Sequence, residues 1–219
     1  MKTENANTAE EVLEKLFCAY PSVVQCKNEI MISLEILLSC WRSGRKLMVC
    51  GNGGSASDAE HIVGEMMKSF RFKRRISPEF AKTYEAITGE NVPDWLEGAA
   101  PALSLVSQTS LMTAFANDES AEGVFAQQVY GYGKAGDVLL CISTSGNSPN
   151  VVEAAKVARA MGILVVSLTG SRDSALSAMS DACIRVPSDK VYEVQEMHLP
   201  IYHALCAASE AELFEGIHD

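Results

Sequence analysis

The stretch that decides the fold is Leu47-Met48-Val49-Cys50-Gly51-Asn52-Gly53-Gly54-Ser55-Ala56-Ser57-Asp58. Its first four residues are an apolar run of the kind that forms a buried strand, and a glycine-rich turn and a helical pattern follow. The glycines permit a tight turn with φ > 0, and Ser57 or Asp58 can cap the helix. The stretch is neither a dinucleotide fingerprint nor a P-loop, because no Gly-Lys-Ser/Thr follows. We interpret it as a strand, an anion- or sugar-binding loop and a helix start, with a plain tight turn as the alternative.

Four further apolar runs resemble this first strand, and a turn and a helical pattern follow each of them. These runs are Ala102–Val106, Val138–Ile142, Ile163–Leu168 and Ala182–Val186. The helical patterns run from Asp58 to about Phe70, over Ala121–Gly131, Ser148–Met161 and Ser174–Ser180, and in a last helix to about Leu213. Continuous apolar runs are typical of strands covered on both faces. The alternation predicts an α/β fold with a doubly wound parallel sheet, whose ligands bind at the carboxyl ends of the strands.

An apolar-rich stretch, Thr8–Trp41, precedes the first strand. It opens with a capping-box pattern at Thr8 and Glu11, and Pro21 divides it into two expected helices. The second helix is apolar around much of its circumference, more than one sheet face needs. A subunit interface would use the excess, and a helix fully covered within the domain is the alternative. The length of 219 residues predicts a single domain over 1–219. If the apolar excess lies at a subunit interface, residues 1–44 are its N-terminal oligomerisation helices.

The segment between Arg71 and Ala100 is long for a connection in a compact domain. Its prolines, glycines and mixed charge indicate either a functional lid or an inserted surface element over 71–100. It begins with a basic cluster, which we expect to be a solvated face that can also steer anions. The members of the cluster are Arg71, Lys73, Arg74 and Arg75.

Charge and cysteine usage exclude several classes of protein. The net charge of −10 disfavours direct binding to nucleic acid. No run of about 18 uncharged apolar residues could span a bilayer, and the polar amino terminus lacks a signal-peptide core, so we expect a cytoplasmic protein without a membrane partner. The seven scattered cysteines are expected to be inert buried thiols.

A hydroxyl-rich turn follows the third predicted strand and leads into a helix. Four of its residues, Ser143, Thr144, Ser145 and Ser148, carry hydroxyls. Together with the free N–H groups of a helix start, they would form a neutral cradle rich in hydrogen-bond donors, which suits a phosphate monoester. The alternative is a serine-rich turn that only caps its helix.

Two helices offer groups for acid–base chemistry. His61 and Glu65 are four residues apart, so they share a helix face, although a surface pair is an equally simple reading. On the last helix, His198 and His203 lie 140° apart, and a regular helix cannot easily turn both toward one site. Pro200 can kink that helix and loosen the constraint.

Five of the chain's motifs resemble those of the sugar isomerase (SIS) domain of bacterial phosphoheptose isomerases. The likeness extends over about Leu47–Lys68 and Leu103–Leu213. Its five motifs are Gly51-Asn52-Gly53-Gly54-Ser55, His61-x-x-x-Glu65, Asn117-Asp118, Gly136–Leu140 leading into Ser143–Ser148, and Gln195–His198 with His203. They occur in the family's order, which makes the resemblance specific.

The resemblance implies a flavodoxin-like sheet of order 2-1-3-4-5, a homotetramer with sites at subunit interfaces, and interconversion of sedoheptulose 7-phosphate with an aldoheptose 7-phosphate through an enediol. It assigns proton transfer to Glu65 and His203, without deciding which removes the carbon-bound proton. It also implies a zinc ion held by His61, Glu65, Gln195 and His203. The substrate-binding residues it implies are Asn52, Gly53, Gly54, Ser55, Asn117, Asp118, Ser143, Thr144, Ser145, Ser148 and Gln195.

Two positions depart from the family pattern. Ser69 stands where an arginine is usual, and Tyr192 stands where an acidic residue is usual. The reaction class therefore follows from the resemblance better than the exact sugar does. A tetrameric regulator of the DiaA type, which binds the replication initiator, is the alternative function, and an isomerase of another phosphosugar is a second. A phosphosugar-sensing module without chemistry would be expected to lack Glu65 or His203.

Overall fold

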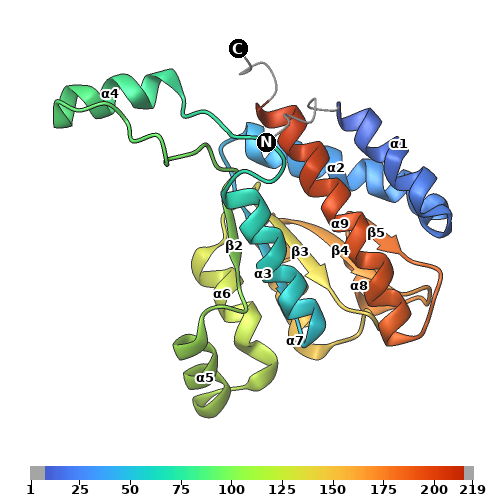
Figure 1. Ribbon diagram of the computed structural model, residues 1–219. Coiled ribbons are helices and arrows are strands. Elements are labelled where there is room, and N and C mark those ends of the chain that lie inside the picture. The colour runs from blue at the N-terminus through green and yellow to red at the C-terminus, as the bar shows by residue number, and fades with distance from the viewer. Residues whose placement is uncertain (1–7, 215–219) are drawn as a thin grey trace.

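The computed structural model describes residues 8–214. Its centre is a five-stranded parallel sheet of order β2-β1-β3-β4-β5 (Figure 1). The strands are β1 (Leu47–Gly51), β2 (Ala102–Ser104), β3 (Val138–Ile142), β4 (Leu164–Thr169) and β5 (Ala182–Arg185). All five predicted strands are present, with β2 shorter than predicted, and both the parallel sheet and its order are confirmed.

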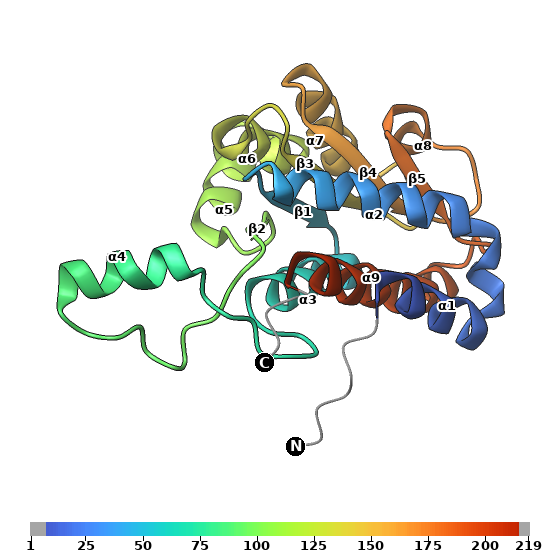
Figure 2. The ribbon, with the colours of Figure 1, turned by 90° about the horizontal axis from the view of Figure 1, so that it is seen from above.

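Successive residues of the central strands feed two separate cores. Leu140 and Ile142 of β3 face one core, and Leu139 and Cys141 face the other. The first core lies under α2 (Lys27–Arg42), α3 (Gly54–Met67) and α9 (Val191–Phe214), with α1 (Ala9–Ala19) packed on α9 (Figure 2). The second lies under α6 (Val124–Tyr132), α7 (Pro149–Ala160) and α8 (Ala175–Met179). Because both faces are covered, the strands need the continuous apolar runs seen in the sequence.

The N-terminal helices form as predicted. Thr8 and Glu11 make both bonds of a capping box at the start of α1, and Pro21 opens a short 3₁₀ helix, Pro21–Cys26, before α2 begins. Most of the apolar surface of α2 is covered within the domain, while Met31 and Ile32 remain exposed. Cover within the domain, the alternative to a subunit interface, therefore accounts for most of the excess apolar surface of this helix.

Two helices differ from the sequence predictions. Helix α3 begins at Gly54 rather than Asp58, because Gly53 adopts a φ of +56° and the Ser55 N–H bonds to the carbonyl of Asn52. Asp58 and Ser57 therefore lie inside the helix and do not cap it. Helix α5 (Thr109–Asp118) was not predicted, and none of its residues is buried, so it lacks a core-facing stripe that sequence periodicity could reveal.

The inserted segment projects from the body of the molecule and carries α4 (Pro78–Thr88) (Figures 1 and 2). No residue of α4 is buried. The expectation of a solvated basic cluster is wrong for Arg74, which is only 1% exposed because it pairs with Glu210 of α9. The reach of α9 back toward this segment, 136 residues later in the chain, creates that buried position.

Five of the seven cysteines are buried, as expected, but Cys18 is exposed and Cys183 is partly exposed. Cys18 lies near the end of α1, the helix that packs outside α9, so it has less protein around it. Within the part of the chain that the structure describes, no helix is both long enough and apolar enough to cross a membrane.

Candidate active site

The packing of α3 against α9 brings His203 to the His61–Glu65 pair, an approach that residue spacing alone could not show. His61 Nε2 lies 3.1 Å from Glu65 Oε1 and 3.5 Å from His203 Nε2. The two imidazole rings meet edge to face, with centroids 4.8 Å apart. The i, i+4 pair of α3 therefore faces α9, with His61 still 44% exposed and Glu65 only 14% exposed.

A hydrogen-bond chain behind His61 orients its ring. The Tyr202 hydroxyl donates to Asp58 Oδ1 at 3.2 Å, and its oxygen lies 3.1 Å from His61 Nδ1. Because the single hydroxyl hydrogen goes to Asp58, His61 Nδ1–H is the donor to tyrosine, and Nε2 of the same ring faces Glu65. Burial raises the pKa of Asp58, while the Tyr202 hydrogen bond and His61 oppose this. Burial, followed by the charge of Asp58, raises the pKa of Tyr202 and keeps its hydroxyl protonated.

Glu65 and His203 have free capacity for proton transfer. Glu65 Oε2 is buried and has no hydrogen-bond partner among the described residues, with Lys68 Nζ 3.7 Å away. Burial lowers the pKa of His203, and the neighbouring His61 lowers it further, while Glu65 opposes both. His203 is therefore a neutral imidazole at neutral pH, able to accept a proton.

The two histidines of α9 face different parts of the molecule, as the helix arithmetic required, even with Pro200 inside the helix. His198 is fully buried, and its Nε2 lies 3.3 Å from the carbonyl oxygen of Thr169 at the end of β4. Burial lowers the pKa of His198 to about 4. His198 is thus a neutral core residue, while His203 lines the site.

The buried His198 makes stability depend on pH. Its pKa is 6.5 when the chain is unfolded and about 4 when it is folded, so acid favours unfolding. As pH falls from 7 to 4, we expect this group to remove about 3 kcal/mol from the free energy of unfolding. Urea unfolding of the wild type and of His198→Gln at both pH values measures the difference. Equal losses in the two proteins would contradict the assignment.

The hydroxyl-rich turn after β3 forms a cradle at the carboxyl edge of the sheet. Ser143 Oγ and Ser148 Oγ are 3.0 Å apart. Ser148 is the N-cap residue of α7, yet its hydroxyl does not cap the helix. Gly146 has a φ of +66°, and a Cβ there would lie 2.1 Å from Ser174 Oγ, so only glycine fits. Because capping does not use the Ser148 hydroxyl, the turn keeps donors for a ligand.

A reciprocal amide pair joins the cradle to the glycine loop. Asn52 Nδ2 donates to Asn150 Oδ1 at 2.8 Å, and Asn150 Nδ2 donates back to Asn52 Oδ1 at 2.9 Å. The pair fixes the loop after β1 against the first turn of α7. The sequence analysis missed Asn150, because an asparagine in a helix start usually indicates only a local turn.

Other predicted substrate residues lie farther from this centre. Gln195 packs beside Gly54, where a Cβ would lie 2.5 Å from its Nε2. Asn117 and Asp118 are exposed at the end of α5, and the Asn117 amide donates to Asp118 Oδ1 at 2.7 Å. Helix α5 packs on α6 and on the short 3₁₀ helix Ala121–Gly123. Gln195 therefore lies at the glycine loop, whereas Asn117 and Asp118 lie exposed at the end of α5.

Ser69 and Tyr192, the two residues that differ from the family pattern, make local contacts. The backbone N–H of Ser69 donates to Glu97 of the inserted segment at 2.8 Å. Tyr192 is exposed, and its hydroxyl donates to Glu193 at 3.2 Å. Neither side chain therefore supplies the charge that the family pattern has there.

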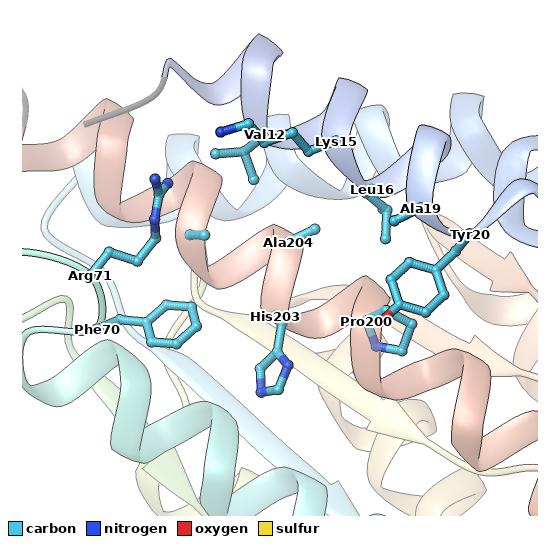
Figure 3. A pocket seen from close by; sticks show the side chains of 11 residues that line it. Val12, Lys15, Leu16, Ala19, Tyr20, Phe70, Arg71, Pro200, His203 and Ala204 are labelled. Carbon is cyan, nitrogen blue, oxygen red and sulfur yellow. The ribbon is translucent and has the colours of Figure 1, made fainter. Parts of the chain in front are cut away.

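A pocket of about 400 Å³ opens beside His203, between α1, α9 and the turn after α3. His203 and Phe70 line it on one side, with ring centroids 5.8 Å apart, and Lys15 and Arg71 lie at its rim (Figure 3). The site is therefore open to solvent from the α1 side.

The donor set fits a zinc ion in part. Ligand atoms on a tetrahedral zinc with bonds of about 2.0–2.1 Å lie about 3.3–3.4 Å apart, close to the separations of His61 Nε2 from Glu65 and from His203. His61 Nε2 also faces the Glu65 carboxylate oxygen, where a proton or a cation can lie between the two atoms. Within residues 8–214, however, no group of three His, Cys, Asp or Glu side chains forms a complete metal site.

The chain is similar to known proteins over most of its length. The family model of the SIS domain matches residues 22–105 and 97–170. The chain is 37% identical to a phosphoheptose isomerase of Akkermansia muciniphila, covering 90% of this chain and 92% of that one, and 37% identical to one of Geobacter sp. strain M21, covering 94% and 97%.

Solved structures agree with this. The phosphoheptose isomerase of Neisseria gonorrhoeae is similar with a TM-score of 0.65 at 33% identity, covering 89% of this chain and 97% of that one. That of Francisella tularensis has a TM-score of 0.69 at 29% identity, covering 90% and 97%. The chain belongs to the SIS-domain family and, within it, to the phosphoheptose isomerases.

Proposed function

We propose that the protein is an aldose–ketose isomerase that interconverts sedoheptulose 7-phosphate and an aldoheptose 7-phosphate. The observation that carries the proposal is that Glu65 and His203 both lie beside His61, between α3 and α9. The hydroxyl cradle after β3 adds a place for the phosphate. The names of the relatives supply the substrate.

The reaction needs two proton transfers. Moving a carbonyl between C1 and C2 requires a base to take the proton from the carbon beside the carbonyl, and an acid to serve the developing enediolate oxygen. Glu65 offers the unbonded, buried Oε2 for the carbon-bound proton. His203, kept neutral by burial, then moves the proton between the two oxygens, and Glu65 returns its proton to the adjacent carbon.

The remaining residues would hold the substrate in an extended pose. Ser143, Thr144, Ser145 and Ser148 would bind the phosphate, and Asn52 and Ser55 would bind hydroxyls. Asn117 and Asp118 are exposed at the end of α5, and we propose that a homotetramer brings them to a site. The helices of residues 1–44 would form part of that assembly, through the exposed Met31 and Ile32 of α2.

We also propose that His61, Glu65 and His203 hold zinc, with Gln195 as a weak fourth ligand. When bound, zinc would polarise the carbonyl as a Lewis acid. The Tyr202–Asp58 chain behind His61 is the kind of support that orients a metal-binding imidazole.

Removing both imidazoles is expected to abolish metal binding. Protein purified without chelator should contain close to one zinc per chain, and His61→Ala/His203→Ala should contain almost none, because one carboxylate and one amide bind zinc weakly. Elemental analysis measures this, with Ser145→Ala/Ser148→Ala as the control that keeps all proposed ligands. Equal zinc in the histidine variant and the control would remove the site.

The substrate assignment is tested by direct assay. We expect the purified protein to convert sedoheptulose 7-phosphate to an aldoheptose 7-phosphate, followed by NMR, with lower kcat/KM for shorter ketose phosphates. Failure to convert any ketose phosphate, combined with capture of a replication initiator, would support the regulator instead. The relatives named above do not favour that alternative.

A further inference from the structure

We propose that the buried ion pair of Arg74 and Glu210 is the positioning device that sets Glu65 against His203. This inference rests on the proposed function, because it assumes that these two groups transfer protons. Arg74 belongs to the base of the inserted segment, and Glu210 belongs to α9. Both side chains are fully buried, and Arg74 Nε donates to Glu210 Oε1 at 2.8 Å.

The other two nitrogens of the guanidinium hold the end of α3. Arg74 Nη2 donates to the carbonyl oxygen of Glu65, and Nη1 donates to that of Met66, each at 2.6 Å. These carbonyls belong to the last turn of α3, where no following residue of the helix can bond them. The Met66 carbonyl also accepts the N–H of Ala100 at 2.9 Å, so among the described residues the Glu65 carbonyl is the one that the ion pair alone is seen to bond. The backbone of the proposed base is therefore bonded directly to the ion pair.

The carboxylate of Glu210 holds the residues that leave α3. Its Oε1 accepts the N–H of Phe70 at 2.8 Å, and its Oε2 accepts the N–H of Arg71 at 2.9 Å. The Phe70 ring in turn lies 5.8 Å from the His203 ring. One carboxylate thus fixes both the turn after α3 and the aromatic wall beside His203.

The register along α9 makes the pair a link between the two catalytic helices. Glu210 follows His203 by seven residues, two helical turns, so the two side chains share a face of α9. Arg74 therefore connects the backbone of Glu65 to the same face that carries His203. Without Arg74, the carbonyls in the last turn of α3 would lose the hydrogen bonds that connect them to Glu210 of α9.

An ion pair suits this task better than apolar packing would. Burying two charges gives little net stability, so stability alone does not explain the pair. Its directional bonds instead satisfy two carbonyls and two N–H groups at defined positions. A guanidinium has a planar fork for this, whereas the single ammonium of lysine cannot bond both carbonyls and the carboxylate with the same geometry.

The test compares Arg74→Lys and Glu210→Gln with Arg42→Lys. Arg42 of α2 pairs at 2.8 Å with Glu212, which lies on α9 as Glu210 does, but the Arg42 side chain is 55% exposed. Rates are expressed per folded protein, measured by circular dichroism and thermal unfolding. Because small misplacements of reacting groups are costly, we expect about a tenfold or larger loss of kcat in both site variants, with KM changed by less than about twofold. KM is expected to stay nearly constant because the proposed phosphate cradle, residues 143–148, lies on the loop after β3 and not on the elements that carry Arg74 and Glu210.

The Arg42→Lys control should keep both constants, and Arg74→Met should lose more kcat than Arg74→Lys. If Arg74→Met does not fold, the kcat values of Arg74→Lys and Glu210→Gln alone test the positioning role. Unchanged kcat per folded protein in both would overturn the positioning role while leaving the isomerase intact. A positioning role is supported when kcat and kcat/KM fall by the same factor and KM is unchanged. The role is contradicted when kcat is unchanged and KM rises by the factor by which kcat/KM falls. An inactive wild type would overturn the proposed function and this inference together.

Discussion

Replacing Glu65 with glutamine is expected to lower kcat by about 10²–10⁴-fold, the usual contribution of a positioned general base. Glutamine keeps the shape of the side chain but cannot take a proton from carbon. His203→Gln should cause a loss of the same order, because it removes the neutral imidazole beside the carboxylate. Steady-state assays with sedoheptulose 7-phosphate measure both.

Glu60→Gln is the matched control for this prediction. Glu60 lies on the same helix as Glu65 and is exposed, and it accepts a hydrogen bond from Ser107 at 2.7 Å. Its variant should keep kcat within about twofold. A Glu65→Gln enzyme as active as Glu60→Gln would remove Glu65 from the chemistry.

Removing two hydroxyls from the cradle is expected to raise KM strongly. Hydrogen bonds to a charged group contribute about 1.5–3 kcal/mol each, so Ser145→Ala/Ser148→Ala should raise KM by about 100-fold or more. Because the cradle follows β3 while Glu65 and His203 lie on α3 and α9, kcat should fall much less. Ser39→Ala, at an exposed position on α2, should leave KM unchanged. An unchanged KM in the double variant would exclude the cradle as the phosphate site.

The fold could be predicted because its signals are local. Each strand is a short continuous apolar run, and the glycine loop and the hydroxyl-rich turn each follow a strand directly, beginning at Asn52 after β1 and at Ser143 after β3. The order of the strands came from the family resemblance, since parallel pairing joins segments far apart in the chain. The parallel sheet then places the two loops at one edge.

The assembly of the site could be predicted only in part. The i, i+4 spacing placed His61 and Glu65 together, but the approach of His203 depends on how α3 packs against α9. The Asn52–Asn150 pair and the buried Arg74 were missed for the same reason. A polar side chain in a loop looks solvated in the sequence, and only its tertiary partner shows otherwise.

The start of α3 illustrates a different limit. Ser57 and Asp58 are good capping residues, but the backbone of Gly53 and Gly54 begins the helix earlier without a side-chain cap. Asp58 is thereby freed to accept the Tyr202 hydroxyl. Local propensity identified the helix, and glycine backbone geometry decided its first residue.

Proton exchange in deuterated water tests the central claim most directly. Sedoheptulose 7-phosphate is incubated with the enzyme, and NMR follows deuterium at C2 of the aldose product and at C1 of the recovered ketose. The account predicts incorporation by the wild type and by Glu60→Gln, and its loss in both Glu65→Gln and His203→Gln. Absence of exchange by the wild type across several ketose phosphates, or undiminished exchange in both variants, would contradict it.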